Sequence, residues 1–599
     1  MADEQLELLT QGNPEQSAAP QTTEERELAL WVQQLFRESW DAKQQLGLYQ
    51  IWRKCDDYKS GRQNPKQSED HPGSTTNITH RIIESQIADL VDKPYSVAAK
   101  GWEPGDDMFA EQAQNLMDFI LYRNSFVEKL NTSEHDRLEL GTTIIKVWFD
   151  PDELDGRGLP VFEPISPANF FPDPKVKNVW DFQKGEFVIH ATPKPLSWFR
   201  KKFERGRYVQ REVSIPYDPQ QTFTDDRSDE VHTSTSQKAL LLECYLRDEE
   251  GKLYCLHVAN DILLADSRKT MKDKPLQRRN LFPFVPIICY QRRGTLWGWG
   301  DVELLMPIQD LINELDDQIR MNARLSGNPQ IVVGMGAGKG FDFRKWTNKP
   351  GLRIPMRDHN AWSIVPPQNV SSDVHVRREK AFQEADLISG VPDVNRGEKP
   401  GQVTAAAAIM ALQQAGQKTV IHKNTMMKQG WAKVLELLFD EVLTHWDEEM
   451  WVRIDGDRPD WKFIDPNDFR RVPRMIPNAL YGVIEGEDPI KQLDDEEGNI
   501  MYRDAQYDFQ LNIGNGFPND RAFMLQIITE FLNARFPEGP AITRSEVRRF
   551  LREQIGVDLD EENDMPQQQP PAPFAPPPGG QVNLPPELQA ALPSIGGVT

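Results

Sequence analysis

Residues 294–333 read GTLWGWGDVELLMPIQDLINELDDQIRMNARLSGNPQIVV, and this stretch decides the class of fold. Apolar side chains recur on one helical face after Asp301, which predicts a helix to about Ser326. At 1.5 Å per residue that helix is roughly 39 Å long, and the Gly-Asn-Pro sequence at 327–329 ends it. The apolar positions are Leu304, Ile308, Leu311, Leu315 and Ile319.

The chain beyond this helix predicts short strands, a second helix and a third, longer one. The segments QIVV, GLRIP and WSIV have strand character, and Ser372 to Ser389 has helical character. An irregular loop, VPDVNRGEKPGQ (391–402), precedes a helix that is expected from Val403 to about Trp446. Gly416 and Gly430 are possible kinks in it.

The flanking regions mix both kinds of element, so the sequence predicts an α+β protein. Upstream, PVFEPI, FVIHATP, ALLLECYL, LYCLHVA and FVPIICY read as strands within 150–295, and TTIIKVWF precedes them. Downstream, MWVRI, WKFI and YDFQLNI are strand-like. Helices are expected from about Thr23, over Asn77–Asp92 and Asp106–Leu130, and twice within 519–556.

Composition excludes several functional classes. The 599 residues carry 69 Lys plus Arg against 92 Asp plus Glu, a formal charge of −23, which argues against a protein that coats duplex nucleic acid. No stretch approaches 18 consecutive apolar residues, and the acidic first residues lack the features of a signal peptide. We therefore expect no association with a membrane.

The four cysteines predict neither a disulfide framework nor a zinc site. Cys55, Cys244, Cys255 and Cys289 are scattered, and no CxxC pair or Cys/His spacing is present. Cys244 and Cys255 would be able to meet across two paired strands, but free thiols are the favoured interpretation. We expect no metal and no other cofactor.

Catalytic motifs are missing or degenerate. The loop GMGAGKG (334–340) has Gly340 where a Walker A motif needs Ser or Thr, so a flexible basic turn is favoured over a phosphate site. Glu134-His135-Asp136 is interpreted as a solvated helix face rather than a metal pair. Asp316 and Asp317 point about 100° apart on a helix and do not predict a shared carboxylate site. Nothing in the sequence supports an enzyme.

The order of these elements resembles the portal proteins of tailed bacteriophages, the head-to-tail connectors. GTLWGWGDVELLMPIQDLINELDDQIRMNARLSGNPQIVV is similar to the portal segment in which a Gly-x-Gly-Asp sequence opens a long helix and Asn-Pro closes it. REKAFQEADLISGVPDVNRGEKPGQVTAAAAIMALQQAG resembles the portal helix, loop and Ala-rich helix. LGTTIIKVWFDP and FEPISPANFFPDPKV resemble the portal wing.

The resemblance implies a portal-type ring subunit with a strand-rich wing, a two-helix stem, a small α/β clip, a long kinked helix and a helical crown. The implied parts are a disordered arm (1–24), the wing (25–300), stem helix 1 (301–326), the clip (327–371), stem helix 2 (372–390), the tunnel loop (391–402), the long helix (403–449), the returning wing strands (450–518), the crown (519–557) and a disordered Pro-rich tail (558–599).

The resemblance also implies a function: a ring of about twelve copies at one capsid vertex of the virion, assembled in the host cytoplasm. Double-stranded DNA would pass through its channel during packaging and ejection. The implied partners are terminase, a head-completion adaptor, and the major capsid and scaffolding proteins. A nucleotide-dependent packaging enzyme is the disfavoured alternative because of the degenerate loop, and an interaction scaffold with a Pro-rich ligand tail is the third.

Three groups of residues follow as candidates. The clip segment has a local charge of +4 and is expected to dock partners, unless its basic residues only solvate a hairpin; they are Lys339, Arg344, Lys345, Lys349, Arg353 and Arg357. In the tunnel loop, transient phosphate contact and simple solvation stay open for Arg396 and Lys399, beside Asp393, Asn395 and Glu398. The stem candidates are Asp310, Glu314, Asp317, Arg377, Arg378 and Lys380.

The acidic stem predicts a field that repels the duplex wherever it faces the channel. Stem helix 1 alone carries six carboxylates against Arg320 and Arg324. They are Asp301, Glu303, Asp310, Glu314, Asp316 and Asp317.

Overall fold

The computed structural model describes most of the chain up to residue 513 and four residues beyond it. The described ranges are 21–65, 73, 75–91, 95–211, 238–270, 275–327, 331–333, 362–364, 371–390, 418–454, 460–477, 490–493, 500–513, 535–536 and 539–540. The chain divides into two compact units, Met1–Asn515 and Gly516–Thr599. In the second, the structure describes the antiparallel pair β21 (Arg535–Phe536) and β22 (Gly539–Pro540). This strand pair lies within 519–556, where two helices were predicted, and the other residues of that range lie outside the described residues.

A five-stranded antiparallel sheet with strand order β4-β5-β6-β7-β8 forms one part of the first unit. The strands predicted at FVIHATP, ALLLECYL and LYCLHVA are confirmed as β5, β6 and β7, whereas β4 and β8 were missed. The segment of β8, ILLAD, follows β7 after only a two-residue turn, where Asn260 takes a φ of 52°. Cys244 and Cys255 lie on neighbouring strands but pair with Leu256 and Tyr245, and all four cysteines are free. The strands are β4 (Phe170–Pro172), β5 (Phe187–Pro195), β6 (Lys238–Arg247), β7 (Leu253–Ala259) and β8 (Ile262–Asp266).

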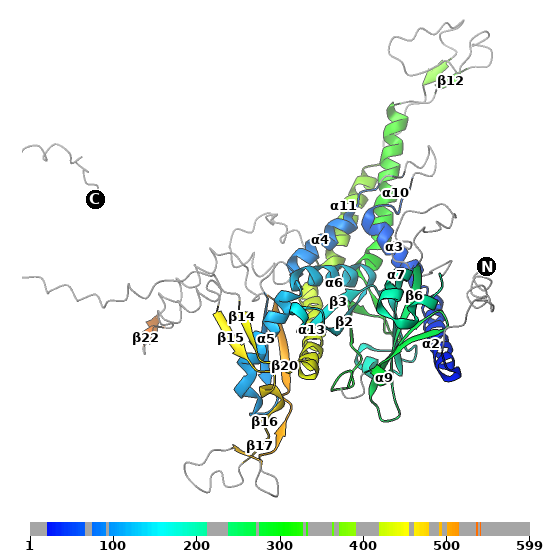
Figure 1. Cartoon of the computed structure of the whole chain (residues 1–599). Helices are drawn as coiled ribbons and strands as arrows, with labels where there is room; N and C mark the ends of the chain where they lie inside the picture. Colours follow the sequence, from blue (N-terminus) through cyan, green and yellow to red (C-terminus); the bar gives the residue numbers. More distant parts are fainter. Residues whose placement is uncertain are drawn as a thin grey trace, which may run out of the picture. The chain divides into compact units, whose positions relative to one another are not determined.

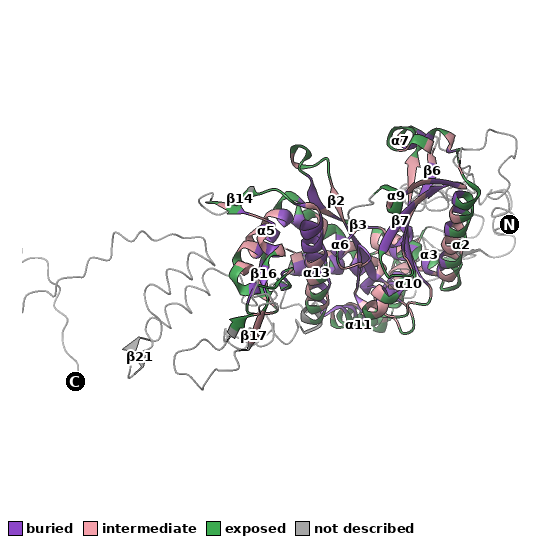
Figure 2. Cartoon of the chain, turned by 60° about the horizontal axis from the view of Figure 1, so that its bottom comes forward, coloured by how far each residue is buried: buried purple, intermediate pink, exposed green. Residues whose placement is uncertain are grey.

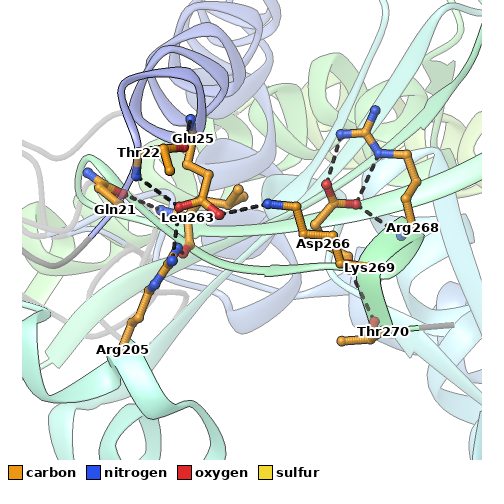
Figure 3. Close-up of polar contacts among 9 residues, drawn as sticks. All are labelled: Gln21, Thr22, Glu25, Arg205, Leu263, Asp266, Arg268, Lys269 and Thr270. Carbon is orange, nitrogen blue, oxygen red and sulfur yellow. Dashed lines mark hydrogen bonds and ion pairs between the residues drawn. The ribbon is translucent and has the colours of Figure 1, made fainter. Parts of the chain in front are cut away.

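Helix α2 (Thr23–Gln45) begins where it was predicted and covers one face of this sheet. Thr22 and Glu25 form a capping box, since each side chain accepts a hydrogen bond from the other's backbone N–H. The Glu25 carboxylate also pairs with Lys269 at 2.7 Å and Arg205 at 2.9 Å, as Figure 3 shows. These cationic partners, Lys269 first, lower the pKa of Glu25 to about 2 and tie the start of α2 to the sheet edge.

A second sheet, β3-β2-β9, carries the largest core of the unit. Its strands are mostly buried (purple in Figure 2), with helices α6 (Phe126–Leu140) and α13 (Lys418–His445) packed against it. On α13, Trp431 is fully buried and meets the rings of Phe126 and Phe162 at 4.9 and 5.4 Å. The strands are β2 (Thr142–Asp150), β3 (Leu159–Ile165) and β9 (Phe284–Ile288).

The chain is interleaved, because strands that are far apart in sequence pair with one another. β1 (Tyr95–Gly101) pairs with β20 (Tyr507–Ile513) over seven residues, and β20 packs on α13. The strand character predicted after residue 450 is confirmed by three further antiparallel pairs. They are β14 (Met450–Ile454) with β15 (Asp460–Ile464), β16 (Val472–Pro473) with β19 (Tyr502–Arg503), and β17 (Met475–Pro477) with β18 (Ile490–Gln492).

The prediction of one helix over Asp106–Leu130 is wrong. The segment forms η1 (Asp106–Phe109), α5 (Ala110–Arg123) and then α6, with a break at Ser125, whose φ is 52°. The cause is Asn124: its amide donates to the carbonyls of Ile120 and Pro160 at 2.9 and 3.0 Å, so the side chain competes with the helical backbone. The expected burial of Leu116, Ile120 and Leu121 on α5 is confirmed.

Several shorter elements complete the unit. Helices α3 (Leu48–Ser60) and α4 (Ile78–Val91) follow α2, and the face of α4 expected to be buried, Ile83, Ile87 and Leu90, is buried. The remaining elements are η2 (Leu154–Gly156), η3 (Pro167–Asn169), η4 (Val179–Lys184), α7 (Leu196–Lys202), η5 (Glu204–Tyr208), α9 (Ser267–Thr270), β10 (Tyr290–Gln291), β11 (Gly298–Trp299) and η8 (Asp468–Arg470).

Candidate functional site

The candidate site is built on two long helices that lie side by side, α10 (Asp301–Gly327) and α11 (Ser372–Ser389), labelled in Figure 1. Beyond their far ends, β12 (Ile331–Val333) and β13 (Trp362–Ile364) pair antiparallel, with Ile331 opposite Ile364. Two of the strands predicted for 328–371 are thereby confirmed, and GLRIP lies outside the described residues. Gly390, with a φ of 71°, caps α11 in the left-handed conformation that favours glycine.

The seam between the two helices is narrow and apolar and includes α4. Small residues on α11 allow a close approach, since Ala381 and Ala385 are fully buried against Leu305 and Ile312 of α10. Ile78 and Ile82 of α4 belong to the same cluster. The three helices therefore form one packed element.

Gln309, a residue that sequence reasoning missed, joins α10 to the start of α4. Its Oε1 accepts hydrogen bonds from the backbone N–H groups of Ile78 and Thr79, at 3.1 and 3.4 Å. Its Nε2 donates to the carbonyl of Thr76 at 2.9 Å. These first N–H groups of α4 have no intrahelical acceptor, so the buried amide caps α4 from a neighbouring helix.

The predicted acidic residues on α10 are partly engaged within the chain. Asp310 accepts a hydrogen bond from the Tyr58 hydroxyl at 2.5 Å, and Asp317 accepts one from Asn64 at 3.3 Å. Glu314 is exposed and accepts from Gln318 at 3.4 Å. The adjacent Asp316 accepts a hydrogen bond from the Thr76 hydroxyl at 2.6 Å, so these contacts of the two neighbouring carboxylates go to different residues.

The predicted basic residues on α11 divide between the seam and the exposed surface. Arg378 crosses the seam and donates to Asp316 at 2.5 Å, with its guanidinium 4.8 Å from the Phe382 ring centroid. Arg377 pairs with Glu384 at 3.4 Å on the exposed side, where Lys380 also lies. The exposed surface of the helix pair is thus mixed in charge.

Two of the acidic residues counted on stem helix 1 form ion pairs within the chain. Asp301 is 1% exposed and forms an ion pair with the fully buried Lys423 of α13. Glu303 pairs with Arg292, with its two oxygens 2.8 and 3.0 Å from one guanidinium nitrogen. Both carboxylates face cations at the base of the helix, and a buried charge is retained only with such a partner.

The solvated face predicted for Glu134-His135-Asp136 is also wrong. Glu134 is fully buried on α6 and accepts two hydrogen bonds from Arg137 Nε, at 2.9 and 3.0 Å. Burial raises the pKa of Asp136 to about 7. The polar sequence at a helix end suggested exposure, whereas α3, α4, α10 and β2 pack against α6.

Several other candidates lie outside the described residues. They are the tunnel-loop residues Asp393, Asn395, Arg396, Glu398 and Lys399, the clip residues Lys339, Arg344, Lys345, Lys349, Arg353 and Arg357, the degenerate loop 334–340 and the Pro-rich tail. Among the described residues, no group of three His, Cys, Asp or Glu side chains is placed to hold a metal ion. None of the described helices is long and apolar enough to cross a membrane.

Comparison with known protein families identifies the family of this chain. Residues 152–483 match the family described as phage SU10 portal protein, which is more than half of the chain. The chain belongs to this portal protein family. A search of curated proteins returned no match.

The portal match confirms the family that the sequence motifs suggested. It spans α10, β12, β13, α11 and α13, so the helix pair and its strand pair lie within the part that defines the portal family. Portal proteins are structural components of the phage capsid and are not enzymes.

Proposed function

We propose that this portal protein forms a closed ring of about twelve copies at one capsid vertex, and that double-stranded DNA passes through the ring during packaging and ejection. The observation that carries the proposal is the helix pair α10–α11, joined through the β12–β13 pair, inside the portal match. In a ring, each subunit with such a packed, elongated helix pair can contribute that pair to the wall of a central channel. The pair would be the stem, and 327–371 the clip.

Charge supports a channel through which DNA slides. The formal charge of −23 per chain means that the ring as a whole repels the duplex, so few phosphates are held tightly. Because Asp301 and Glu303 are paired internally, the repulsion on α10 would come from Asp310 and Glu314. On α11, the exposed Lys380 and the Arg377–Glu384 pair lie on the same helix as the exposed Asp373 and Glu379, so α11 presents charges of both signs.

The ring is tested by negative-stain images and native mass measurement of the purified chain. The proposal expects closed rings of about twelve subunits. A monomer, or an open fibre, would contradict it. An ATP-hydrolysis assay with and without DNA tests the alternative, since robust turnover by the chain alone would favour a packaging enzyme.

Partner docking is proposed for the basic clip. Replacing Lys345, Lys349 and Arg353 with Glu should weaken binding of terminase or of the head-completion adaptor while ring formation and unfolding midpoint stay unchanged. The rationale is electrostatic, because the clip is locally basic in an acidic chain. Unchanged binding would remove the clip residues from the proposal without touching the ring.

DNA contact is proposed for the tunnel loop, residues 391–402. Deleting Asp393–Gly401 should leave rings intact and reduce packaging or retention of DNA in assembled heads. If rings no longer form, the loop is a structural part of the ring and the proposed contact with DNA is wrong.

A further inference from the structure

One buried glutamine contacts both the last residue of α11, just before the tunnel loop, and a residue of α13. Gln86 lies on α4 and is fully buried. Its Nε2 donates to the backbone carbonyl of Ser389 at 3.0 Å, and its Oε1 accepts from Lys423 Nζ at 3.0 Å. Ser389 is the last residue of α11, and Lys423 lies near the start of the described part of α13. A single side-chain amide therefore connects the end of α11 to α13.

The two ends are held by further contacts to the same core. Arg81, also on α4, pairs with Asp386 of α11 at 3.5 Å, one turn before the contact made by Gln86. Lys423 pairs with Asp301 at the start of α10, and its ammonium lies 5.4 Å from the Tyr290 ring centroid. The Gln86 amide thus connects the end of α11 to the ion pair between Lys423 of α13 and Asp301 of α10.

Helix α4 is rigidly seated, so it can act as the fixed support. Its buried face, with Ile83, Ile87 and Leu90, packs on Leu138 of α6 and Val302 of α10. Gln309 caps its first turn from α10. If the end of α11 or Lys423 of α13 moved away from α4, its hydrogen bond to Gln86 would break.

Because they are buried, the hydrogen bonds of Gln86 contribute to the stability of this part of the fold. Hydrogen bonds to charged groups contribute more than neutral ones, and a buried donor or acceptor left without a partner costs its full desolvation. Loss of the Gln86 amide would leave the Lys423 ammonium with its partner Asp301 but without one hydrogen-bond acceptor, and would remove the Gln86 donor from the Ser389 carbonyl.

We propose that Gln86 is a positioning residue that fixes the end of α11, where the tunnel loop begins, relative to α13 and to the start of α10. This inference rests on the proposed function only in assigning the intervening segment to the DNA channel. Whether the Gln86 amide restrains the end of α11 and α13 can be tested on the purified full chain without DNA.

The test is hydrogen–deuterium exchange of the full chain for two variants of Gln86. Gln86→Leu removes both contacts, so amides at 386–390 and at 418–425 should exchange about tenfold faster, while amides of α5 stay unchanged. Gln86→Glu keeps an acceptor for Lys423 and loses the donor to Ser389. It should therefore accelerate exchange at 386–390 only.

The split between the end of α11 and α13 distinguishes positioning from general stability. Gln34→Leu, at an exposed position of α2, is the matched control and should change neither segment. Equal acceleration across α5 and both segments, or no change at either segment, would overturn the inference. In assembled heads, Gln86→Leu should reduce DNA retention with rings intact. Failure of the wild-type chain to form rings would instead refute the proposed function, and leave the exchange result standing.

Discussion

Substituting Gly430 with Ala tests why a glycine lies in the middle of α13. The glycine either allows a kink or makes room for a close contact. The two explanations predict changes of opposite sign in the free energy of unfolding. The described helix is continuous from Lys418 to His445, and Gly430 is buried against β9. A Cβ at this position would lie 2.6 Å from both Cδ1 and Cγ1 of Ile287 and 2.9 Å from its Cγ2.

The magnitude follows from these distances. Carbon atoms pack at about 3.5–4.0 Å, so three contacts fall short by up to about 1 Å, and a β-branched side chain on a strand has little rotamer freedom to escape. Overpacking of this kind costs about 1–3 kcal/mol, and we expect the upper end. Replacing Gly by Ala in a helix returns about 1 kcal/mol. The expected net loss in the free energy of unfolding is about 2 kcal/mol.

The assay is urea unfolding at matched protein concentration, because oligomerisation makes the midpoint depend on concentration. Gln429→Ala, exposed on the same helix, is the control and should change stability by no more than about 0.5 kcal/mol. In the background of Ile287→Ala, Gly430→Ala should cost less than it does alone, because the three clashing carbons are gone. A gain of about 1 kcal/mol for Gly430→Ala alone would refute the packing argument and favour a flexible role.

Three further measurements address the seam, the core and the thiols. Arg378→Ala should lower stability by about 0.5–1 kcal/mol through loss of its pair with Asp316, and Arg378→Lys should recover only part of it, as urea midpoints would show. Burial raises the pKa of Asp440 to about 6, so its ionisation costs stability as pH rises from about 4 through 6. Asp440→Asn should therefore become more stable than wild type with rising pH, by about 2–3 kcal/mol at pH 8, and a pH-independent difference would contradict this. Finally, a thiol reagent at pH 8 should label no cysteine of the folded chain and all four in urea, because burial raises the pKa of Cys55 and Cys289 to about 12; rapid labelling of the folded chain would be inconsistent with the packing.

Secondary structure was largely predictable from local patterns. The bounds of α10 and α11 follow from apolar periodicity, Gly390 and the Gly-Asn-Pro sequence, and they agree with the structure to within a residue. The failure at Asn124 shows the limit of periodicity. Its side chain reaches Pro160, 36 residues away, and that contact breaks the helix.

The electrostatics of the helix pair were less predictable than its length. Sequence reasoning counted Asp301 and Glu303 with the exposed carboxylates because they share a helix with Asp310. The structure pairs them with Lys423 and Arg292 instead. Formal charge is a property of composition, but the field at a surface depends on which charges are neutralised inside.

Family, fold class and the absence of a recognisable catalytic motif could be read from the order of motifs along the chain, because helix periodicity, helix ends and turns depend on residues within a few positions of each other. The tertiary structure alone decided the contacts that hold the site together. Gln86 reaches Ser389 across 303 residues and Lys423 across 337, and β1 pairs with β20 across more than 400. A buried amide or ammonium takes whichever partner the packed fold brings within reach, so no local pattern identifies that partner.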